Sequence, residues 1–214
     1  MKRREIDYSL YLVTDRVLAG GRCLDEIVRQ SIEGGVTVVQ LREKNLGTRD
    51  FLARAVALRR VTCEMGIPLI INDRVDIALA CEADGVHLGQ EDMDSATARR
   101  LVGKNMIIGV SVNTPKEAME AEGAGADYLG AGPVFATPTK TDTSPPTGLS
   151  GIGEIRRVVG LPLVAIGGIS SANAGEIVRC GADGVAVVSA IIASKHPGLS
   201  AREILAEVGK ARSG

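Results

Sequence analysis

The run Gln40-Leu41-Arg42-Glu43-Lys44 directly follows a short apolar stretch and carries the densest candidate chemistry in this sequence. Because side chains alternate between the two faces of an extended chain, Gln40, Arg42 and Lys44 should project to one side and the other two residues to the opposite side. An amide, a guanidinium and an ammonium on one face form a strong anion site, and phosphate suits it. The alternative is a solvated charge cluster after a strand.

Acidic residues follow the next two apolar runs along the chain. Asn72-Asp73 ends one run, and Asp92 comes shortly after the other. Mg²⁺ takes one or two carboxylates and completes its shell with water and phosphate oxygens, so Asp73 and Asp92 are candidate ligands beside the basic run. Glu91 is a weaker candidate. Asp92 could instead cap the following helix, although Asp94 competes for that position.

Two later segments could bind a phosphate monoester through the backbone. Gly167-Gly168 and Ser189 end the last two apolar runs. Glycine lets backbone N–H groups approach phosphate oxygens, and the start of a following helix adds its dipole. Between these segments and the earlier runs, Ser111 could hydrogen-bond a substrate or only satisfy a turn. His87 lies within an apolar run and is interpreted as a buried, hydrogen-bonded structural residue rather than an acid or base.

A polar stretch over 136–148 has no predicted helix or strand, and stretches of this length usually form a lid or a binding loop, or are disordered. Thr137, Thr139 and Lys140 would meet phosphate when such a loop closes. Closure would also keep water from a reactive intermediate.

Composition limits the class of protein that can carry these residues. The chain has 214 residues, a formal net charge of −1 and a pI near 6.2, which argues against a broad basic surface for nucleic acid. The four cysteines are far apart and form no CxxC pair, so they are interpreted as reduced thiols packed in helices. With no apolar run of membrane-spanning length and a poor signal peptide, we expect a cytoplasmic protein that binds small molecules. The oligomeric state stays open, a homo-oligomer included.

Short apolar runs that could form buried strands alternate with segments of helical period. Such runs are typical of parallel strands covered on both faces. The expected strands are Leu10–Thr14, Val36–Arg42, Pro68–Asn72, Gly85–Gly89, Met106–Val112, Tyr128–Val134, Leu163–Gly167 and Val185–Ser189. The clearest helical patterns are Arg49–Met65, Asn113–Gly123, Ala172–Cys180 and Ala201–Arg212.

An internal repeat favours a closed barrel over a doubly wound sheet. Related turns precede every second expected strand, most clearly Gly125-Ala126-Asp127 and Gly181-Ala182-Asp183. Glycine there supplies the left-handed conformation that ends a helix. Four (βα)₂ units make eight strands, so residues 1–214 are predicted to form one α/β domain, a (β/α)₈ TIM barrel with its site at the carboxyl ends of the strands.

Two different anion sites in one barrel mouth suggest a coupling reaction. The glycine-built site suits a monophosphate, whereas the basic site with a metal suits a diphosphate. A diphosphate beside Mg²⁺ and cationic side chains is prepared to leave, because the developing charge is stabilised. No cysteine or serine is paired recognisably with a histidine, so covalent catalysis is not indicated.

Taken in order, these segments and several others resemble the thiamine-phosphate synthase family over nearly the whole chain. The matching segments are Tyr11-Leu-Val-Thr-Asp15, Gln40 to Lys44, Asn72-Asp73, Val86-His-Leu-Gly-Gln90 with Asp92, Gly109-Val-Ser111, Gly132-Pro133, Thr137-Pro-Thr-Lys140, Ile166-Gly-Gly-Ile169 and Val188-Ser189. The closest departure is Arg74, which could assist diphosphate binding or pair with an acidic neighbour.

The resemblance implies a TIM barrel that joins a hydroxymethylpyrimidine diphosphate to a thiazole phosphate by a dissociative reaction. It implies that the pyrimidine diphosphate is bound by Gln40, Leu41, Arg42, Glu43, Lys44, Asn72, Ser111 and Lys140. It implies Mg²⁺ on Asp73 and Asp92, and thiazole phosphate on Thr137, Pro138, Thr139, Gly168, Val188 and Ser189. The candidate catalytic residues are Arg42, Lys44, Ser111 and Lys140.

Two alternatives remain at this point. A thiazole tautomerase on the same barrel would need only the thiazole phosphate, and it should not need a complete diphosphate and metal site. A catalytically silent barrel could bind a phosphorylated metabolite and act through partners. Pyrophosphate release would separate a coupling enzyme from both.

Overall fold

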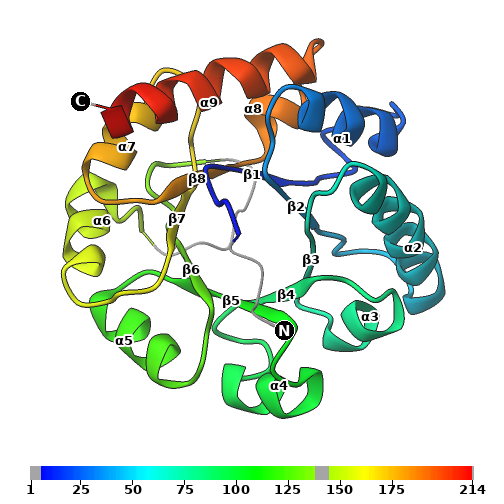
Figure 1. The fold of residues 1–214 in the computed structure, drawn as a ribbon, viewed down its shortest axis with the longest axis horizontal. Coiled ribbons are helices and arrows are strands. Elements are labelled where there is room, and N and C mark those ends of the chain that lie inside the picture. Colours follow the sequence, from blue (N-terminus) through cyan, green and yellow to red (C-terminus); the bar gives the residue numbers. More distant parts are fainter. Residues whose placement is uncertain (1–5, 138–144, 214) are drawn as a thin grey trace.

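The computed structural model describes residues 6–137 and 145–213 and confirms the predicted barrel (Figure 1). Eight parallel strands pair in sequence order, and β8 closes onto β1. The strands are β1 (Leu10–Val13), β2 (Val38–Leu41), β3 (Leu69–Asn72), β4 (Gly85–Leu88), β5 (Ile107–Val112), β6 (Tyr128–Ala131), β7 (Leu163–Ile166) and β8 (Gly184–Val187). All eight fall within or next to the predicted runs.

The helices form an outer ring around the barrel (Figure 1). They are α1 (Leu24–Glu33), α2 (Thr48–Glu64), α3 (Val75–Ala80), α4 (Ser95–Val102), α5 (Pro115–Gly123), α6 (Gly148–Arg156), α7 (Ala174–Arg179), α8 (Ser189–Ile192) and α9 (Pro197–Ser213). The short α8 was not predicted. The eighth helix of the outer ring is therefore α9, which packs between α7 and α1.

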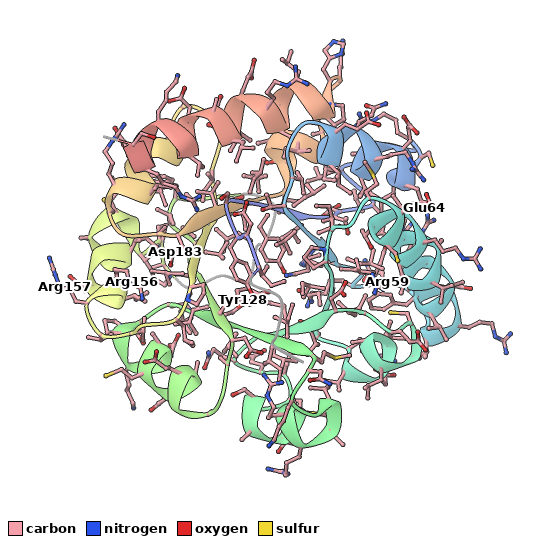
Figure 2. The ribbon with its side chains drawn as sticks, in the orientation of Figure 1. Arg59, Glu64, Tyr128, Arg156, Arg157 and Asp183 are labelled. Atoms are coloured by element: carbon pink, nitrogen blue, oxygen red, sulfur yellow. The ribbon has the colours of Figure 1, made fainter. Side chains whose placement is uncertain are left out.

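Strand alternation divides the core into two layers. In β1, Leu10 and Leu12 face the helices, whereas Tyr11 and Val13 face the barrel axis. The axial layer consists of Tyr8, Tyr11, Val13, Val38, Ile70, Ile107, Tyr128, Val164 and Ala186. Figure 2 places Tyr128 near the centre of the ring. The barrel is thus a filled core, and an open site can form only at its ends.

All four repeated turns have the left-handed backbone conformation that the sequence predicts, but one of them uses a residue other than glycine. Gly35, Gly125 and Gly181 have φ values of 109°, 88° and 110°, a region that favours glycine. At the corresponding position before β4 stands Glu82, which adopts φ 52°. One repeat therefore carries a strained non-glycine residue where the others carry glycine.

An aspartate in three of the repeats fastens the preceding odd strand. Asp84, Asp127 and Asp183 each accept a hydrogen bond through Oδ2 from a backbone N–H near the start of β3, β5 or β7. The donors are Leu69 (2.8 Å), Ile108 (2.7 Å) and Leu163 (2.7 Å). In the remaining repeat, the hydroxyl of Thr37 accepts from Leu10 N at 3.1 Å. The repeat thus caps the amino-terminal ends of all four odd strands.

An arginine from the preceding even helix pairs with each of these aspartates. Arg59 of α2, Arg99 of α4 and Arg156 of α6 contact Asp84, Asp127 and Asp183 respectively. Figure 2 shows Arg156 beside Asp183 between α6 and the barrel, whereas Arg157 points outward. We call these three Arg–Asp pairs the amino-terminal collar.

The cysteines are free thiols, as predicted, but their placement differs from the prediction. Only Cys63 lies inside a helix, and Cys23 and Cys63 are exposed. Cys23, Cys81 and Cys180 stand at helix ends. Within the described part of the chain, no helix combines the length and the apolar character that a transmembrane span requires.

Candidate active site

A cavity of about 410 Å³ opens at the carboxyl ends of the strands and collects most of the predicted site residues. A more open groove of about 720 Å³ lies at the amino-terminal end. Of its charged groups, Arg59 and Asp84 are already paired with each other in the collar, and Asp7 accepts hydrogen bonds from the backbone N–H and the hydroxyl of Ser9. The chemistry therefore belongs to the smaller cavity, in agreement with the general placement of sites in this fold.

The basic run at the end of β2 turns three side chains toward the cavity. Gln40, Arg42 and Lys44 line it, as the alternation predicts. Leu41 and Glu43 do not line it, as the alternation also predicts, although the family resemblance implies both as contacts of the diphosphate substrate. Leu41 is fully buried in the layer between barrel and helices. The Glu43 side chain is 4% exposed and lies 3.4 Å from a guanidinium nitrogen of Arg16.

The end of β1 supports Arg42. The Thr14 hydroxyl accepts a hydrogen bond from the backbone N–H of Arg42 at 3.1 Å. The Arg42 guanidinium lies 3.7 Å from Asp15, whose other oxygen accepts from the backbone N–H groups of Val17 and Leu18. This loose ion pair leaves the guanidinium with further donors for a ligand.

Asp73 follows β3 in a strained conformation. Its φ is 63°, unusual for a residue with a side chain, and its backbone N–H donates to the carbonyl of His87. Its carboxylate lies 2.6 Å from Lys44 Nζ. Strain of this kind concentrates at functional sites, where surrounding structure maintains it.

Asp92 faces Asp73 across the cavity edge. Its Oδ2 accepts from the backbone N–H of Gly89 at 2.7 Å. Partial burial of the Asp92 carboxyl and the neighbouring Asp73 carboxyl raise the pKa of Asp92 above its ordinary value. Asp94 is the residue that caps α4, by accepting from Thr97 N, so Asp92 is not needed for that purpose.

The two carboxylates fit a hard divalent cation. Across residues 6–137 and 145–213, no group of three or more His, Cys, Asp or Glu side chains is arranged to hold a metal. A facing pair of carboxylates is nevertheless the protein contribution that Mg²⁺ requires when phosphate and water complete its shell. The mutual repulsion that raises the pKa of Asp92 is the force that such a cation would relieve.

A line of polar side chains forms the cavity floor. Gln40 Nε2 donates to the Tyr11 hydroxyl at 2.9 Å, and Tyr11 and Tyr128 share a hydrogen bond of 2.8 Å. Tyr128 contacts His87 Nδ1 at 2.9 Å, and His87 Nε2 contacts the Ser111 hydroxyl at 2.9 Å. We call these five residues the floor chain. His87 is buried and hydrogen-bonded, as predicted, but it lines the cavity as well.

The sequence reasoning missed Tyr11 and Tyr128 as cavity residues. Burial raises the pKa of both phenols, so both remain protonated. The signal that could have found them is their strand position. In the observed pairing Tyr128 is opposite Gly109, and a glycine opposite a large inward residue indicates space made for it.

The opposite wall comes from β7 and β8. Gly167, Gly168, Val188 and Ser189 all line the cavity. Gly167 and Gly168 have φ values of 105° and 66°, and a Cβ on Gly168 would meet Phe135 at 2.8 Å. In α8, Ile191 N–H and Ile192 N–H donate to the Val188 carbonyl, so the candidate phosphate donors of this helix are the N–H groups of Ser189 and Ala190. Backbone donors on a turn that excludes side chains suit a phosphate monoester.

The remaining predictions concern the loop after β6 and Arg74. Thr137 lines the cavity, whereas Pro138, Thr139 and Lys140 lie outside the described residues. Arg74 pairs with Asp76 at 2.5 Å and donates to Thr48, so it follows the second of the two alternatives considered for it.

Comparisons with known proteins agree with this geometry. The family model for thiamine monophosphate synthase matches residues 10–191. A thiamine-phosphate synthase of Albidiferax ferrireducens is 56% identical, with 90% of this chain and 88% of that protein covered. One of Chloroflexus aurantiacus is 52% identical, with 95% and 94% covered.

Solved structures give the same picture. Thiamine phosphate pyrophosphorylase from Pyrococcus furiosus superposes with a TM-score of 0.86 at 42% identity, and 96% of this chain and 97% of that chain are covered. A 3-hexulose-6-phosphate synthase superposes with a TM-score of 0.68 at 18% identity over 93% of this chain and 99% of that one, which shows the fold alone.

Proposed function

The chain belongs to the thiamine monophosphate synthase family and is a transferase, and on this premise we propose its substrates, metal and mechanism. The substrates are 4-amino-2-methyl-5-hydroxymethylpyrimidine diphosphate and thiazole phosphate, and the products are thiamine phosphate and pyrophosphate. The observation that carries this proposal is one cavity with two unlike anion-binding walls, a charged wall on β2–β4 and a backbone wall on β7–β8.

The charged wall would take the diphosphate. Arg42 offers several N–H donors and Lys44 a compact charge, so together they neutralise much of a diphosphate's charge. Asn72, which also lines the cavity, adds an amide. Lys140 remains a predicted contact of this substrate. Because the negative charge of the diphosphate grows as it leaves, donors placed at this wall favour bond breaking.

Asp73 and Asp92 would hold Mg²⁺. When bound, the ion would neutralise further charge on the leaving diphosphate. Lys44 Nζ lies 2.6 Å from Asp73 Oδ2 and would hold that carboxylate in place at the cavity lining.

The proposed reaction breaks one bond and forms one bond. The C–O bond between the pyrimidine methylene and the diphosphate breaks, and its electron pair leaves with the diphosphate oxygen. The resulting cation is stabilised by the pyrimidine ring, and the thiazole nitrogen then donates its lone pair to form the C–N bond. No protein nucleophile is needed for this reaction. The sequence predicted no serine paired with a histidine, and the structure corrects that prediction, because Ser111 Oγ lies 2.9 Å from His87 Nε2.

The backbone wall would fix the acceptor. Gly168, Val188 and Ser189 lie where a phosphate monoester can accept from backbone N–H groups. Thr137, with the predicted Pro138 and Thr139, would contact the same substrate. Holding the thiazole by its phosphate places the nitrogen close to the cation and raises the rate of capture over that of water.

Pyrophosphate release tests this proposal. Purified protein with both substrates and Mg²⁺ should release pyrophosphate and form thiamine phosphate in equal amounts. Reactions that lack either substrate, or contain EDTA, serve as controls. Absence of product with fresh substrates would contradict the proposal, and conversion of the thiazole phosphate alone would indicate a tautomerase.

A further inference from the structure

The floor chain has a direction that follows from its donors. Gln40 Nε2 donates to the Tyr11 hydroxyl. Because burial raises the pKa of Tyr11, that phenol keeps its proton, and the proton goes to its other partner, Tyr128. Tyr128 is also protonated, and having accepted from Tyr11 it donates to His87 Nδ1. Each phenol thus accepts one proton and donates one.

The direction continues through the imidazole to the serine. An imidazole whose Nδ1 accepts from Tyr128 carries its proton on Nε2. That Nε2–H donates to Ser111 Oγ at 2.9 Å. The hydroxyl of Ser111 then has its own proton free to point elsewhere, and Ser111 lines the cavity.

We propose that His87 and Tyr128 are positioning residues that hold the Ser111 hydroxyl as a hydrogen-bond donor into the cavity, with His87 in its neutral Nε2–H tautomer. The acceptor would be an oxygen of the anionic diphosphate, and in this respect the inference rests on the proposed function. A donor in that place strengthens as the leaving group gains charge.

The opposite direction is electrostatically poor. If Nδ1 carried the proton, Ser111 would have to donate to Nε2 and would present only lone pairs to the cavity. Lone pairs repel an anionic ligand bound beside Arg42 and Lys44. With the direction assigned here, the Ser111 hydroxyl instead adds one more hydrogen-bond donor to the basic cavity.

The fold makes room for the floor chain. Gly109 of β5 lies against the Tyr128 ring, and a Cβ there would overlap the phenol. A Cβ on Gly130 of β6 would lie 2.9 Å from His87 Cε1. In addition, Gln90 Nε2 donates to the Ser111 carbonyl at 2.6 Å and holds that backbone in place. The two glycines therefore leave the space that the Tyr128 and His87 rings occupy, and the Gln90 amide holds the backbone of Ser111, the last residue of the floor chain.

Histidine ¹⁵N NMR of the full-length protein without substrate tests the direction. The chain has two histidines, His87 and the exposed His196, so a His196→Gln variant identifies the signals of His87. We expect Nε2 of His87 to be protonated and Nδ1 to be unprotonated. A proton on Nδ1, or on both nitrogens, would overturn the proposal. This measurement needs no turnover, so its failure is distinct from failure of the proposed function.

A double-mutant cycle tests the positioning role. Tyr128→Phe removes the donor to His87 and should lower kcat about 10-fold, with an unchanged KM for thiazole phosphate. Tyr8→Phe is the matched control, because its ring packs 4.8 Å from that of Tyr128 while its hydroxyl takes no part in the four bonds of the floor chain. The control should keep kcat near that of the unmodified protein.

The same substitution should lose its effect when Ser111 is absent. In a Ser111→Ala background, Tyr128→Phe should change kcat less than about 2-fold, because the floor chain acts through the missing hydroxyl. Ser111→Thr, which retains a hydroxyl, should recover most of the activity that Ser111→Ala loses. An equal 10-fold loss from Tyr128→Phe in both backgrounds would overturn the positioning role.

Discussion

The two ends of the barrel use the same charged residues in opposite ways. At the amino-terminal collar, each aspartate pairs with an arginine and also accepts from a strand N–H, and the arrangement occurs three times. At the carboxyl end, Arg42 lies 3.7 Å from Asp15, and Asp92 faces the like charge of Asp73. Lys44 pairs with Asp73 at 2.6 Å, but among residues 6–137 and 145–213 no such pattern repeats there from strand to strand.

Ion pairs that repeat around the barrel and have their hydrogen bonds made indicate a role in stability. Charged residues that do not repeat, and that face a like charge or have a strained backbone, indicate a ligand-binding site. Arg99 and Asp127 satisfy strand and loop backbone groups that would otherwise be costly to bury. Asp73 and Asp92 each have one favourable contact, with Lys44 and with the Gly89 N–H, but the two carboxyls also face each other and Asp73 has an unusual φ. Variants at the two ends should therefore separate stability from turnover.

The largest effect should come from removing a charge in the mouth. Asp73→Asn or Asp92→Asn retains size and loses the carboxylate charge, and we expect kcat to fall about 100-fold because the cation loses a ligand. Steady-state pyrophosphate release at saturating Mg²⁺ measures this loss. The unfolding free energy should change by less than about 0.5 kcal/mol, since neither residue fastens a strand.

Glu91→Gln is the matched control for that comparison. Glu91 lines the same cavity, and Glu91→Gln removes one negative charge from it. Unlike Asp73, Glu91 is not among the groups that shift the pKa of Asp92. We expect it to keep kcat within about 3-fold of the unmodified value, as surface charges usually contribute little. Equal losses at all three carboxylates would show that net charge, and not a specific ligand pair, controls turnover.

The collar should give the reverse result. Asp127→Ala leaves the N–H of Ile108 and the guanidinium of Arg99 without this acceptor, and we expect a loss of about 2 kcal/mol of unfolding free energy. For a domain of this size the melting temperature should fall by about 4–8 °C. Thermal unfolding measures the loss, and kcat per folded molecule should be unchanged.

A conservative variant separates the two bonds of Asp127. Asp127→Asn keeps an acceptor for Ile108 N and loses the charge that pairs with Arg99, so it should destabilise about half as much as Asp127→Ala. If kcat per folded molecule fell in either variant, the collar would also contribute to turnover, and the proposed difference between the two ends would be wrong.

The sequence predicted the repeated features better than the unrepeated ones. The turns around Gly125 and Gly181 predicted eight strands because a helix end needs the left-handed conformation that glycine adopts easily. Alternation placed Gln40, Arg42 and Lys44 on one face. The same rule placed Leu41 and Glu43 on the opposite face, and neither lines the cavity, so only the family resemblance implies them as substrate contacts.

What the sequence did not predict depends on contacts across the barrel. Tyr11 and Tyr128 meet from β1 and β6, far apart in the chain, and their role on the cavity floor depends on the closed register. The function of Asp94 as a helix cap, which frees Asp92 for the mouth, also required the observed hydrogen bond to Thr97. The short α8 was missed because four residues give too little periodicity to detect.

Mg²⁺ should stabilise the folded protein, and the size of this stabilisation should depend on pH because the proposed site contains Asp92. The pKa of Asp92 is raised in the folded state, so in the metal-free protein the charged carboxylate lowers the unfolding free energy at neutral pH. This loss disappears as the pH falls through the raised pKa toward the ordinary aspartate pKa of about 4. Free Mg²⁺ at ten times its Kd should add about 1.4 kcal/mol at neutral pH, and less in acid because protons compete for the carboxylates.

Asp92→Asn tests the same charge without a metal. It should raise the melting temperature of the metal-free protein at pH 7 by less than about 2 °C, because Asp92 is exposed enough for water to screen the repulsion. The Mg²⁺ response should disappear with it, whereas Asp127→Asn should retain the full response. Mg²⁺ stabilisation that is equal in all three proteins would place the ion elsewhere.

The smallest expected effect compares strain of the same kind at the two ends. Glu82 near the collar and Asp73 in the mouth both adopt positive φ, at 52° and 63°. Glycine relieves such strain but costs entropy on folding, so Glu82→Gly and Asp73→Gly should each raise the unfolding free energy by only about 0.5 kcal/mol. Glu82→Gly should leave kcat unchanged, because Arg59 contacts only the backbone carbonyl of Glu82. Asp73→Gly should abolish turnover despite equal or greater stability. Full activity in Asp73→Gly would show that neither the Asp73 carboxylate nor the strain at this position is needed for turnover, and it would contradict the assignment of Asp73 to the metal.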